Sequence, residues 1–269
     1  MQATVFFKNL WDDYVKLAPQ AEAIQHLFST TYACPIQNDH VAFRTFARSP
    51  ISIEKLQPLL AMVGYQPYDE YHFAEKKLFA KSYAHTDPEQ PLVFLSELNW
   101  WDLHDDCQDI IGRILQQIPD DTAQHPDIFW SSTHWPKISW QDYLLLESSS
   151  EYAAWLSAHG LHANHFTVSI NALPKLANIT EIVKLLHDNN FALNVAGGEI
   201  KGTKADLLMQ ASTLAPEIVV DFADASHPIP GCYYEFAERL PDNQGNLFRG
   251  FVPASANKIF ESTDRNQKR

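Results

Sequence analysis

Cysteine is scarce in this chain of 269 residues, and the three that occur, Cys34, Cys107 and Cys232, lie far apart. An odd number of widely spaced cysteines argues against a disulfide framework and against a zinc site built from thiolates. The sequence also lacks any run of the roughly 18 apolar residues that a membrane helix needs, and no basic and then apolar leader follows Met1. We therefore expect a cytoplasmic protein with no membrane partner, in which any metal is bound by histidine and carboxylate groups.

Basic residues are also few, because 20 Lys and Arg stand against 33 Asp and Glu, a formal net charge of −13. Phosphate backbones are bound by basic stripes, and this sequence has none, so we expect no nucleic-acid partner. Neither a GxGxxG nor a Walker spacing follows Gly197 and Gly198, which we interpret as a turn. An anionic small molecule would therefore need a local arginine or lysine. The 45% hydrophobic content is typical of a globular protein with one large core or two fused modules.

The segment at residues 38–46, Asn-Asp-His-Val-Ala-Phe-Arg-Thr-Phe, predicts a β-strand with two chemically different faces. Side chains alternate along a strand, so His40 and Arg44 share one face while Val41 and Phe43 share the other. The two polar residues are about 13 Å apart along an extended chain, and the arginine stem can lean back over much of that gap. A small anion would then bridge a metal at His40 and the guanidinium of Arg44. The pattern is equally compatible with a histidine and an arginine that form an ordinary polar pair.

A second segment repeats this pattern. Residues 164–171, Asn-His-Phe-Thr-Val-Ser-Ile-Asn, again place a histidine, His165, near the start of a strand with alternating polar and apolar side chains. Each strand is followed by a helix candidate, at residues 52–62 and 179–187. We interpret the repetition as an internal duplication, in which each half brings one histidine to a shared site.

The order of the expected elements divides the chain into four parts that form one compact α+β unit. Residues 1–34 are N-terminal helices, residues 35–99 a βαβββ module, residues 100–161 a helical and aromatic insertion, and residues 162–269 a second βαβββ-type module with the C-terminal segment. Pro19 is expected to split the N-terminal part into two helices. After the two histidine strands, the strands are expected at residues 65–73, 78–83, 92–98, 191–195, 204–211, 218–222 and 232–239.

A carboxylate completes the candidate metal site. Glu235 lies among aromatic residues in the last expected strand, and a buried carboxylate is costly unless it is paired or bound to a metal. With His40 and His165 it makes a two-histidine, one-carboxylate set, which is typical of non-haem Fe(II) enzymes that activate O₂, although zinc or manganese accept the same donors. Glu97, in the expected strand at residues 92–98, is a reserve ligand.

Five separated sequence motifs resemble those of a known protein family. The segments DHVAFRTF, NHFTVSIN, LLMQAST, YYEFAER and FRGFVPASANKIFEST resemble those of the 2-oxoadipate dioxygenase/decarboxylase family, once known only as a domain of unknown function. The resemblance extends from about residue 35 to the C-terminus. It implies a fold related to the vicinal oxygen chelate superfamily, with two βαβββ-type modules around a shared metal cavity.

The resemblance also implies roles for individual residues of the two histidine strands and the glutamate strand. It makes His40, His165 and Glu235 the ligands of Fe(II). Arg44, four residues after the first histidine, matches the residue that binds the far carboxylate of the substrate and takes part in catalysis.

The C-terminal part of the resemblance concerns a Pro-x-Ser motif, which falls on Pro253, Ala254 and Ser255. It implies that Ala254 and Ser255 bind substrate and that Ser255 assists catalysis. Gln210 is a further candidate for substrate binding, because its amide shares a strand face with Ser212 that would form either a cavity wall or a polar outer surface. The connection at residues 239–252 is short, whereas longer family members carry a large insertion at this point.

The reaction implied by the resemblance uses Fe(II), O₂ and a 2-oxo dicarboxylic acid, and 2-oxoadipate would give 2-hydroxyglutarate and CO₂. Two other classes of protein stay open from the sequence. A metal-dependent lyase or isomerase on the same fold would recruit a fourth ligand such as Glu97, and a non-catalytic protein that binds small acids would need no metal. The sequence leaves the oligomeric state open.

Overall fold

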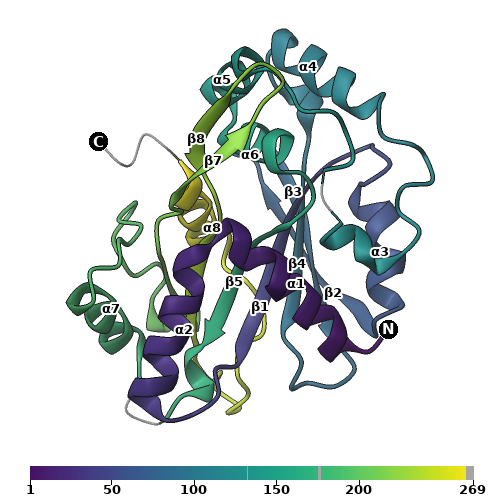
Figure 1. Ribbon diagram of the computed structural model, residues 1–269. Coiled ribbons are helices and arrows are strands. Elements are labelled where there is room, and N and C mark those ends of the chain that lie inside the picture. Colours follow the sequence, from purple (N-terminus) through teal and green to yellow (C-terminus); the bar gives the residue numbers. More distant parts are fainter. Residues whose placement is uncertain (132, 175–176, 265–269) are drawn as a thin grey trace.

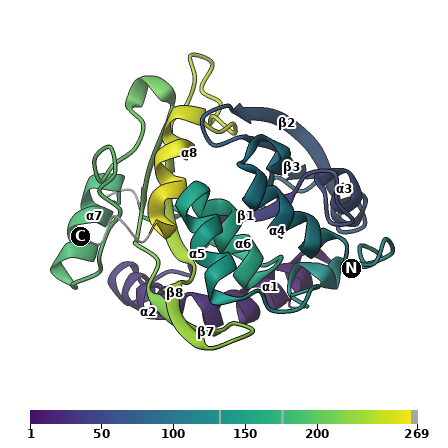
Figure 2. The same cartoon turned by 90° about the horizontal axis from the view of Figure 1, so that it is seen from above.

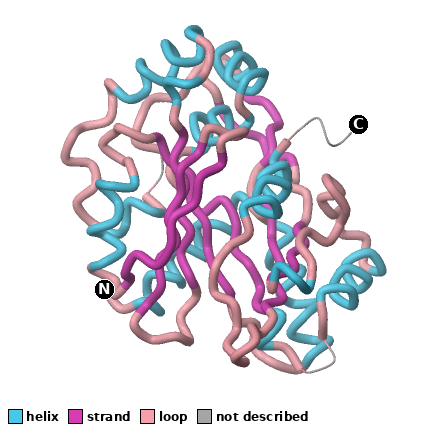
Figure 3. Tube along the Cα trace, turned by 180° about the vertical axis from the view of Figure 1, so that it is seen from behind, coloured by secondary structure: helices cyan, strands magenta, loops and turns pink. Residues whose placement is uncertain are grey.

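A computed structural model describes residues 1–131, 133–174 and 177–264. Its central feature is a seven-stranded sheet with the strand order β2-β3-β4-β1-β5-β9-β6. Figure 1 shows α1 and α2 crossing one face of this sheet, and Figure 3 shows the strands from behind. The edge strands β2 and β6 both contact α8, because the sheet curls around the opposite face, as the view from above shows (Figure 2).

The two N-terminal helices are confirmed as α1 (Ala3–Leu17) and α2 (Pro19–Tyr32). Proline lacks an N–H and is tolerated at the first turn of a helix, so Pro19 begins α2 where α1 has ended. The buried residues Phe6 and Tyr14 lie on the sheet-facing side of α1, and the ring of Tyr14 packs 5.0 Å from that of Phe166. The apolar face of the sheet is therefore covered by these helices.

The first module has the predicted βαβββ order. Its elements are β1 (Asn38–Phe46), α3 (Ile53–Ala61), β2 (Tyr65–Phe73), β3 (Leu78–His85) and β4 (Leu92–Leu98). β4 returns beside β1 in parallel, with His40 opposite Leu92 and Arg44 opposite Ser96. Val41 and Phe43 are fully buried on the face below α1 and α2, while His40 and Arg44 lie on the other face, as the alternation predicted.

The second module follows the same plan with one strand fewer in the sheet. It contains β5 (Ala163–Ser169), α7 (Ile179–Asp188), β6 (Leu208–Ser212) and β9 (Tyr233–Arg239). β9 runs parallel to β5 as β4 runs parallel to β1, and β1 and β5 pair antiparallel between them. The two halves therefore meet at the two histidine strands, in an approximately two-fold arrangement.

Two strand predictions in this module were wrong. Residues 191–195 form no strand, because only Leu193 makes an isolated bridge, with Thr213, and Val195 is 59% exposed where Gly197 begins a turn. The segment expected at residues 204–211 begins with a short 3-10 helix and becomes a strand only at Leu208. The strand expected at residues 218–222 is β7 (Glu217–Asp221), which pairs with β8 (Ser226–Pro230) in a separate hairpin.

The insertion between the modules is more helical than predicted. It holds α4 (Asp105–Leu115), α5 (Trp140–Ser149) and α6 (Glu151–His159). The last two were missed, although Ser139 and Ser150 cap them by accepting hydrogen bonds from the backbone N–H groups of Asp142 and Ala153. Ser139 and Ser150 are the sequence signal from which these two helices could have been predicted. The division at residues 34, 99 and 161 stays a prediction.

The chain returns to the sheet in α8 (Pro253–Ile259) and ends its described part near a 3-10 helix, Phe260–Thr263. The other 3-10 helices are Trp100–Asp102, Pro126–Phe129, Ile170–Ala172 and Lys204–Asp206. Within the described ranges, no helix is long and apolar enough to cross a membrane.

Candidate metal centre

The strand register brings the three predicted ligands together. On the face that curls toward α8, His40 of β1 lies opposite Thr167 of β5, which in turn lies opposite Glu235 of β9. His165 stands one row further along β5, beside Tyr233 of β9. Each side chain thus comes from a different strand, and regular pairing alone places them side by side.

The ligand atoms are close enough for a single ion. His40 Nε2 and His165 Nε2 are 3.4 Å apart, and the two carboxylate oxygens of Glu235 lie 3.7 Å from the first and 3.3 Å from the second. Ligands about 2.1 Å from one metal are separated by roughly 3.0 to 4.2 Å. The prediction that the two histidines share one cavity is therefore confirmed, and all three side chains are buried.

The cluster has the chemistry of a cation site. Glu235 Oε2 is buried and has no hydrogen-bond partner among the described residues, which is unusual for a carboxylate oxygen. Burial lowers the pKa of His165 well below its ordinary value, with His40 and Arg44 acting in the same direction, so its imidazole is neutral and has a lone pair to offer. Burial also raises the pKa of Glu235, a cost that a bound cation would offset. The residues present therefore fit a divalent metal.

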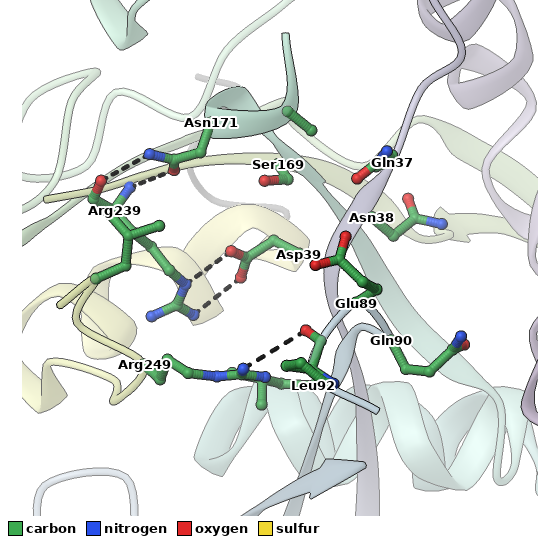
Figure 4. A pocket seen from close by; sticks show the side chains of 13 residues that line it. Gln37, Asn38, Asp39, Glu89, Gln90, Leu92, Ser169, Asn171, Arg239 and Arg249 are labelled. Atoms are coloured by element: carbon green, nitrogen blue, oxygen red, sulfur yellow. Dashed lines mark hydrogen bonds and ion pairs between the residues drawn. The ribbon is translucent and has the colours of Figure 1, made fainter. Parts of the chain in front are cut away.

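An ion pair that the sequence analysis missed supports the first ligand. Asp39 Oδ1 accepts a hydrogen bond from His40 Nδ1 at 2.7 Å, which leaves Nε2 facing the cluster. Arg239 holds the same carboxylate in a two-point contact of 2.7 and 2.9 Å (Figure 4). Although burial alone would raise it, the pKa of Asp39 is held well below its usual range by Arg239 and His40. A carboxylate behind a metal-binding imidazole fixes its tautomer and orientation.

Arg239 also fixes the short C-terminal connection. Its Nη1 donates to the backbone carbonyls of Phe248 and Gly250, at 3.0 and 2.8 Å. This brings Phe251 over the site, where its ring packs 4.8 Å from that of His40. The residues between β9 and α8 therefore form part of the cavity wall.

Gln210 lies on the cavity wall, as expected. Its amide Nε2 donates to Glu235 Oε1, so it orients the carboxylate, and Ser212 next to it on the same strand hydrogen-bonds Ser262. The cavity bounded by the three ligands, Gln210 and apolar side chains has a volume of about 20 Å³. That is room for roughly one water molecule. The site therefore has room for an ion as it stands, and a larger ligand requires the wall to move.

Arg44 lies on the same face, at the other end of β1, and is buried at 1% exposure. Its Nη1 donates to Glu151 Oε1 at 2.7 Å and its Nη2 to Thr263 Oγ1 at 2.9 Å, while Nε has no partner among the described residues. Tyr152 and Trp155 of α6 place their rings about the guanidinium, at 4.9 and 5.2 Å. The sequence analysis missed Glu151, which begins a helix that it did not predict.

The Pro-x-Ser motif lies further from the cluster than the resemblance suggested. Pro253 and Ala254 are exposed at the start of α8, and Ser255 is buried against Gly202. None of the three lines the cavity, because the side of α8 that faces it presents Ala256 and Ile259. The roles of Ala254 and Ser255 stay predictions.

Glu97, the reserve ligand, is on the wrong face of the sheet to reach the metal cluster. It lies opposite Thr45 on β1, and its carboxylate accepts a hydrogen bond of 2.9 Å from the backbone N–H of Ile53 at the start of α3. The position of Glu97 therefore gives no support to a four-ligand lyase or isomerase site.

A separate polar hollow of about 430 Å³ opens to the surface near the Asp39–Arg239 pair (Figure 4). Figure 4 shows Asn171 and Arg249 among the side chains around it. The hollow shares Asp39 with the support of His40 but contains none of the three ligands. The three candidate metal ligands therefore belong to the small cavity and not to this hollow.

Comparison with known proteins identifies the family of this chain. A sequence model of the 2-oxoadipate dioxygenase/decarboxylase family matches residues 18–124 and 119–247. The chain is 34% identical, over 284 residues that cover 96% of it and 78% of the relative, to a protein of rice (Oryza sativa subsp. japonica) named 2-oxoadipate dioxygenase/decarboxylase, chloroplastic/amyloplastic.

Solved structures give the same picture. The hydroxyglutarate synthase of Oryza sativa in complex with 2-oxoadipate is 31% identical, with a TM-score of 0.90 over 98% of this chain and 92% of that one. A putative hydrolase from Shewanella frigidimarina is 40% identical, with a TM-score of 0.88 over 94% of this chain and 98% of that one.

A more distant structure supports the fold alone. A putative glyoxalase superfamily protein from Ralstonia eutropha is 18% identical, with a TM-score of 0.73 over 92% of this chain and 83% of that one. The predicted α+β fold is confirmed, and the relation to the vicinal oxygen chelate superfamily is supported by likeness of fold alone. Because the family model and the curated relative each cover most of its length, the chain belongs to the 2-oxoadipate dioxygenase/decarboxylase family.

Proposed function

We propose that the protein is a non-haem Fe(II) enzyme that uses O₂ to decarboxylate and hydroxylate a 2-oxo dicarboxylic acid. The observation that carries the proposal is the buried cluster of His40, His165 and Glu235, whose donor set is typical of Fe(II) oxygenases. With 2-oxoadipate the balanced reaction consumes one O₂ and yields one 2-hydroxyglutarate and one CO₂. The rice structure with bound 2-oxoadipate supports this choice of substrate.

The residues of the chain have separable tasks in this reaction. His40, His165 and Glu235 would hold the iron, which when bound supplies the redox chemistry that activates O₂. Asp39 keeps His40 in the tautomer whose Nε2 is free to bind. Phe251 and the other rings of the wall exclude water, so electrostatic interactions inside the site are strong.

Arg44 would select a dicarboxylic substrate. Its guanidinium is buried in a chain with a net charge of −13, and a carboxylate is the natural partner of its unused Nε–H. The substrate would then extend along the face of β1 past Ala42, which has the small side chain between His40 and Arg44.

Substrate entry would require the wall to open, because a cavity of about 20 Å³ cannot hold a six-carbon acid. The elements best placed to move are α8 and the segment around Phe251, which cover the cluster from the C-terminal side.

The proposal is tested by loading the purified protein with Fe(II) without oxygen and then measuring O₂ uptake and CO₂ release with 2-oxoadipate, 2-oxoglutarate and 2-oxohexanoate. We expect O₂ uptake and CO₂ release in a one-to-one ratio, with 2-oxoadipate the best substrate. Iron-loaded protein that releases CO₂ or converts the acid without consuming O₂ would contradict the oxygenase assignment.

A further inference from the structure

Tyr233 shares the row of His165, which lies between the row of His40 and Glu235 and the position of Arg44. It precedes Glu235 by two residues on β9 and shares its face, in register with His165. Its ring stacks on that of His165, with centroids 4.5 Å apart and planes 22° apart. The opposite member of this row on β1 is Ala42, whose small side chain separates His40 from Arg44. The side chain of Tyr233 therefore lies on the same face of the sheet as the metal ligands and Arg44.

The hydroxyl of Tyr233 is buried without a hydrogen-bond partner. The residue is 0% exposed, and no described residue bonds its hydroxyl, although its backbone carbonyl accepts a hydrogen bond from Tyr14. A buried hydroxyl without a partner is unfavourable, and phenylalanine would fill the same place without that cost. The hydroxyl is explained if its hydrogen-bond partner is a ligand that is absent here.

A second orphan donor lies at the same end of the site. Arg44 Nε is also buried and without a partner among the described residues, although both of its Nη atoms are bonded. The guanidinium of Arg44 lies 5.2 Å from the ring of Trp155, whose Nε1 donates to the carbonyl of Gly231, two residues before Tyr233. An acceptor with two oxygens can accept a hydrogen bond from each of these two donors, and a carboxylate is such an acceptor.

We propose that the Tyr233 hydroxyl and the Arg44 Nε–H together bind the distal carboxylate of the substrate. This inference rests on the proposed function and adds a binding residue to it. It makes Tyr233 a determinant of chain length, because a second carboxylate must reach both donors while the 2-oxo acid end lies at the metal. Tyr233 holds the ligand and takes no part in proton transfer.

The test compares Tyr233→Phe with Tyr234→Phe, which alters the next residue on the same strand. Tyr234 is equally buried, and its hydroxyl also has no hydrogen-bond partner among the described residues, but it faces α1, where its ring packs 5.8 Å from Trp11. Both changes remove only an oxygen and keep the ring. A difference between the two variants therefore reports on the face of the sheet and not on the loss of a buried hydroxyl.

Two measurements are made on wild type and both variants. Calorimetry gives the affinity of Fe(II)-loaded protein for 2-oxoadipate without oxygen, and steady-state assays give kcat and KM for 2-oxoadipate and 2-oxohexanoate, which has the same length but one carboxylate. For Tyr233→Phe we expect affinity and kcat/KM for 2-oxoadipate to fall roughly 10- to 100-fold, with 2-oxohexanoate nearly unaffected and the melting temperature not lowered. Tyr234→Phe should match wild type in kcat/KM.

Equal losses on both acids, or a lower melting temperature with unchanged affinity, would show that Tyr233 is structural and overturn the inference. If wild type and Tyr233→Phe turn over 2-oxoadipate equally well, this inference alone is overturned. If wild type binds 2-oxoadipate but consumes no O₂, the proposed reaction is refuted. The calorimetric affinities then show whether Tyr233 binds the acid. Wild type that does not bind 2-oxoadipate would overturn both.

Discussion

Replacing Arg44 by methionine should separate substrate recognition from metal binding. Methionine keeps an unbranched stem between the rings of Tyr152 and Trp155 but removes the guanidinium. Losing one desolvated, charge-assisted contact costs on the order of 2 to 5 kcal/mol. We therefore expect kcat/KM for 2-oxoadipate to fall by roughly 30-fold to several thousand-fold, at about 1.4 kcal/mol per factor of ten.

The same change should affect stability only moderately. Glu151 loses its charged partner but keeps the hydrogen bond from Thr263 Oγ1, and its side chain is 18% exposed, so water can partly replace the guanidinium. A cost of about 1 to 3 kcal/mol is the ordinary range for such a loss, and it should appear as a melting temperature lower by several degrees. Arg44→Lys should restore stability more than activity, because an ammonium cannot form the two parallel bonds of a guanidinium.

The assay is steady-state O₂ uptake with 2-oxoadipate and with 2-oxohexanoate, together with iron content per chain. Arg44→Met should retain full iron content and nearly wild-type kcat/KM on 2-oxohexanoate, since Arg44 is not among the metal ligands. An equal loss on both acids would refute the reasoning, because it would make Arg44 structural and remove the main support for a dicarboxylic substrate.

Three further predictions follow from the site and its surroundings. His165→Ala should abolish stoichiometric iron binding and turnover while circular dichroism shows an intact fold; retention of one iron per chain would remove His165 from the ligand set. Asp39→Asn should weaken Fe(II) affinity roughly 10- to 100-fold, measured by competition with a chelator, and unchanged affinity would show that His40 needs no carboxylate behind it. The pKa of His159 is lowered by burial to about 4, below the roughly 6.5 of an unfolded histidine. The unfolded chain therefore binds the extra proton, and stability should decrease by up to about 3 kcal/mol as the pH falls from 6.5 to 4. In urea titrations across that range His159→Gln should lose stability less steeply than wild type, and identical slopes would contradict the assignment.

The parts of the site that could be predicted from the sequence are those that follow from local periodicity. His40 and His165 each open a strand whose alternation predicted one polar and one apolar face, and the repeat predicted that the two would meet. The fully buried Val41 and Phe166 and the 3.4 Å between the imidazoles agree with that reasoning. The carboxylate of Glu235 was identified because it lies among aromatic residues in its strand.

The parts that sequence could not reach depend on pairings between distant segments. Arg239 is 200 residues from Asp39, and no local pattern connects them. Glu151 meets Arg44 only because α6 packs beside β1, and that helix was hidden within an aromatic stretch. Residues 191–195 had the composition of a strand, but only Leu193 makes a bridge and the chain turns at Gly197.

The central claim is that His40, His165 and Glu235 together hold the catalytic iron. Crystals grown without oxygen from Fe(II)-loaded protein, with diffraction measured on both sides of the iron absorption edge, locate the metal directly. We expect a single anomalous peak about 2.0 to 2.3 Å from His40 Nε2, His165 Nε2 and a carboxylate oxygen of Glu235. An iron peak elsewhere in the chain, with none among these three side chains, would contradict the account.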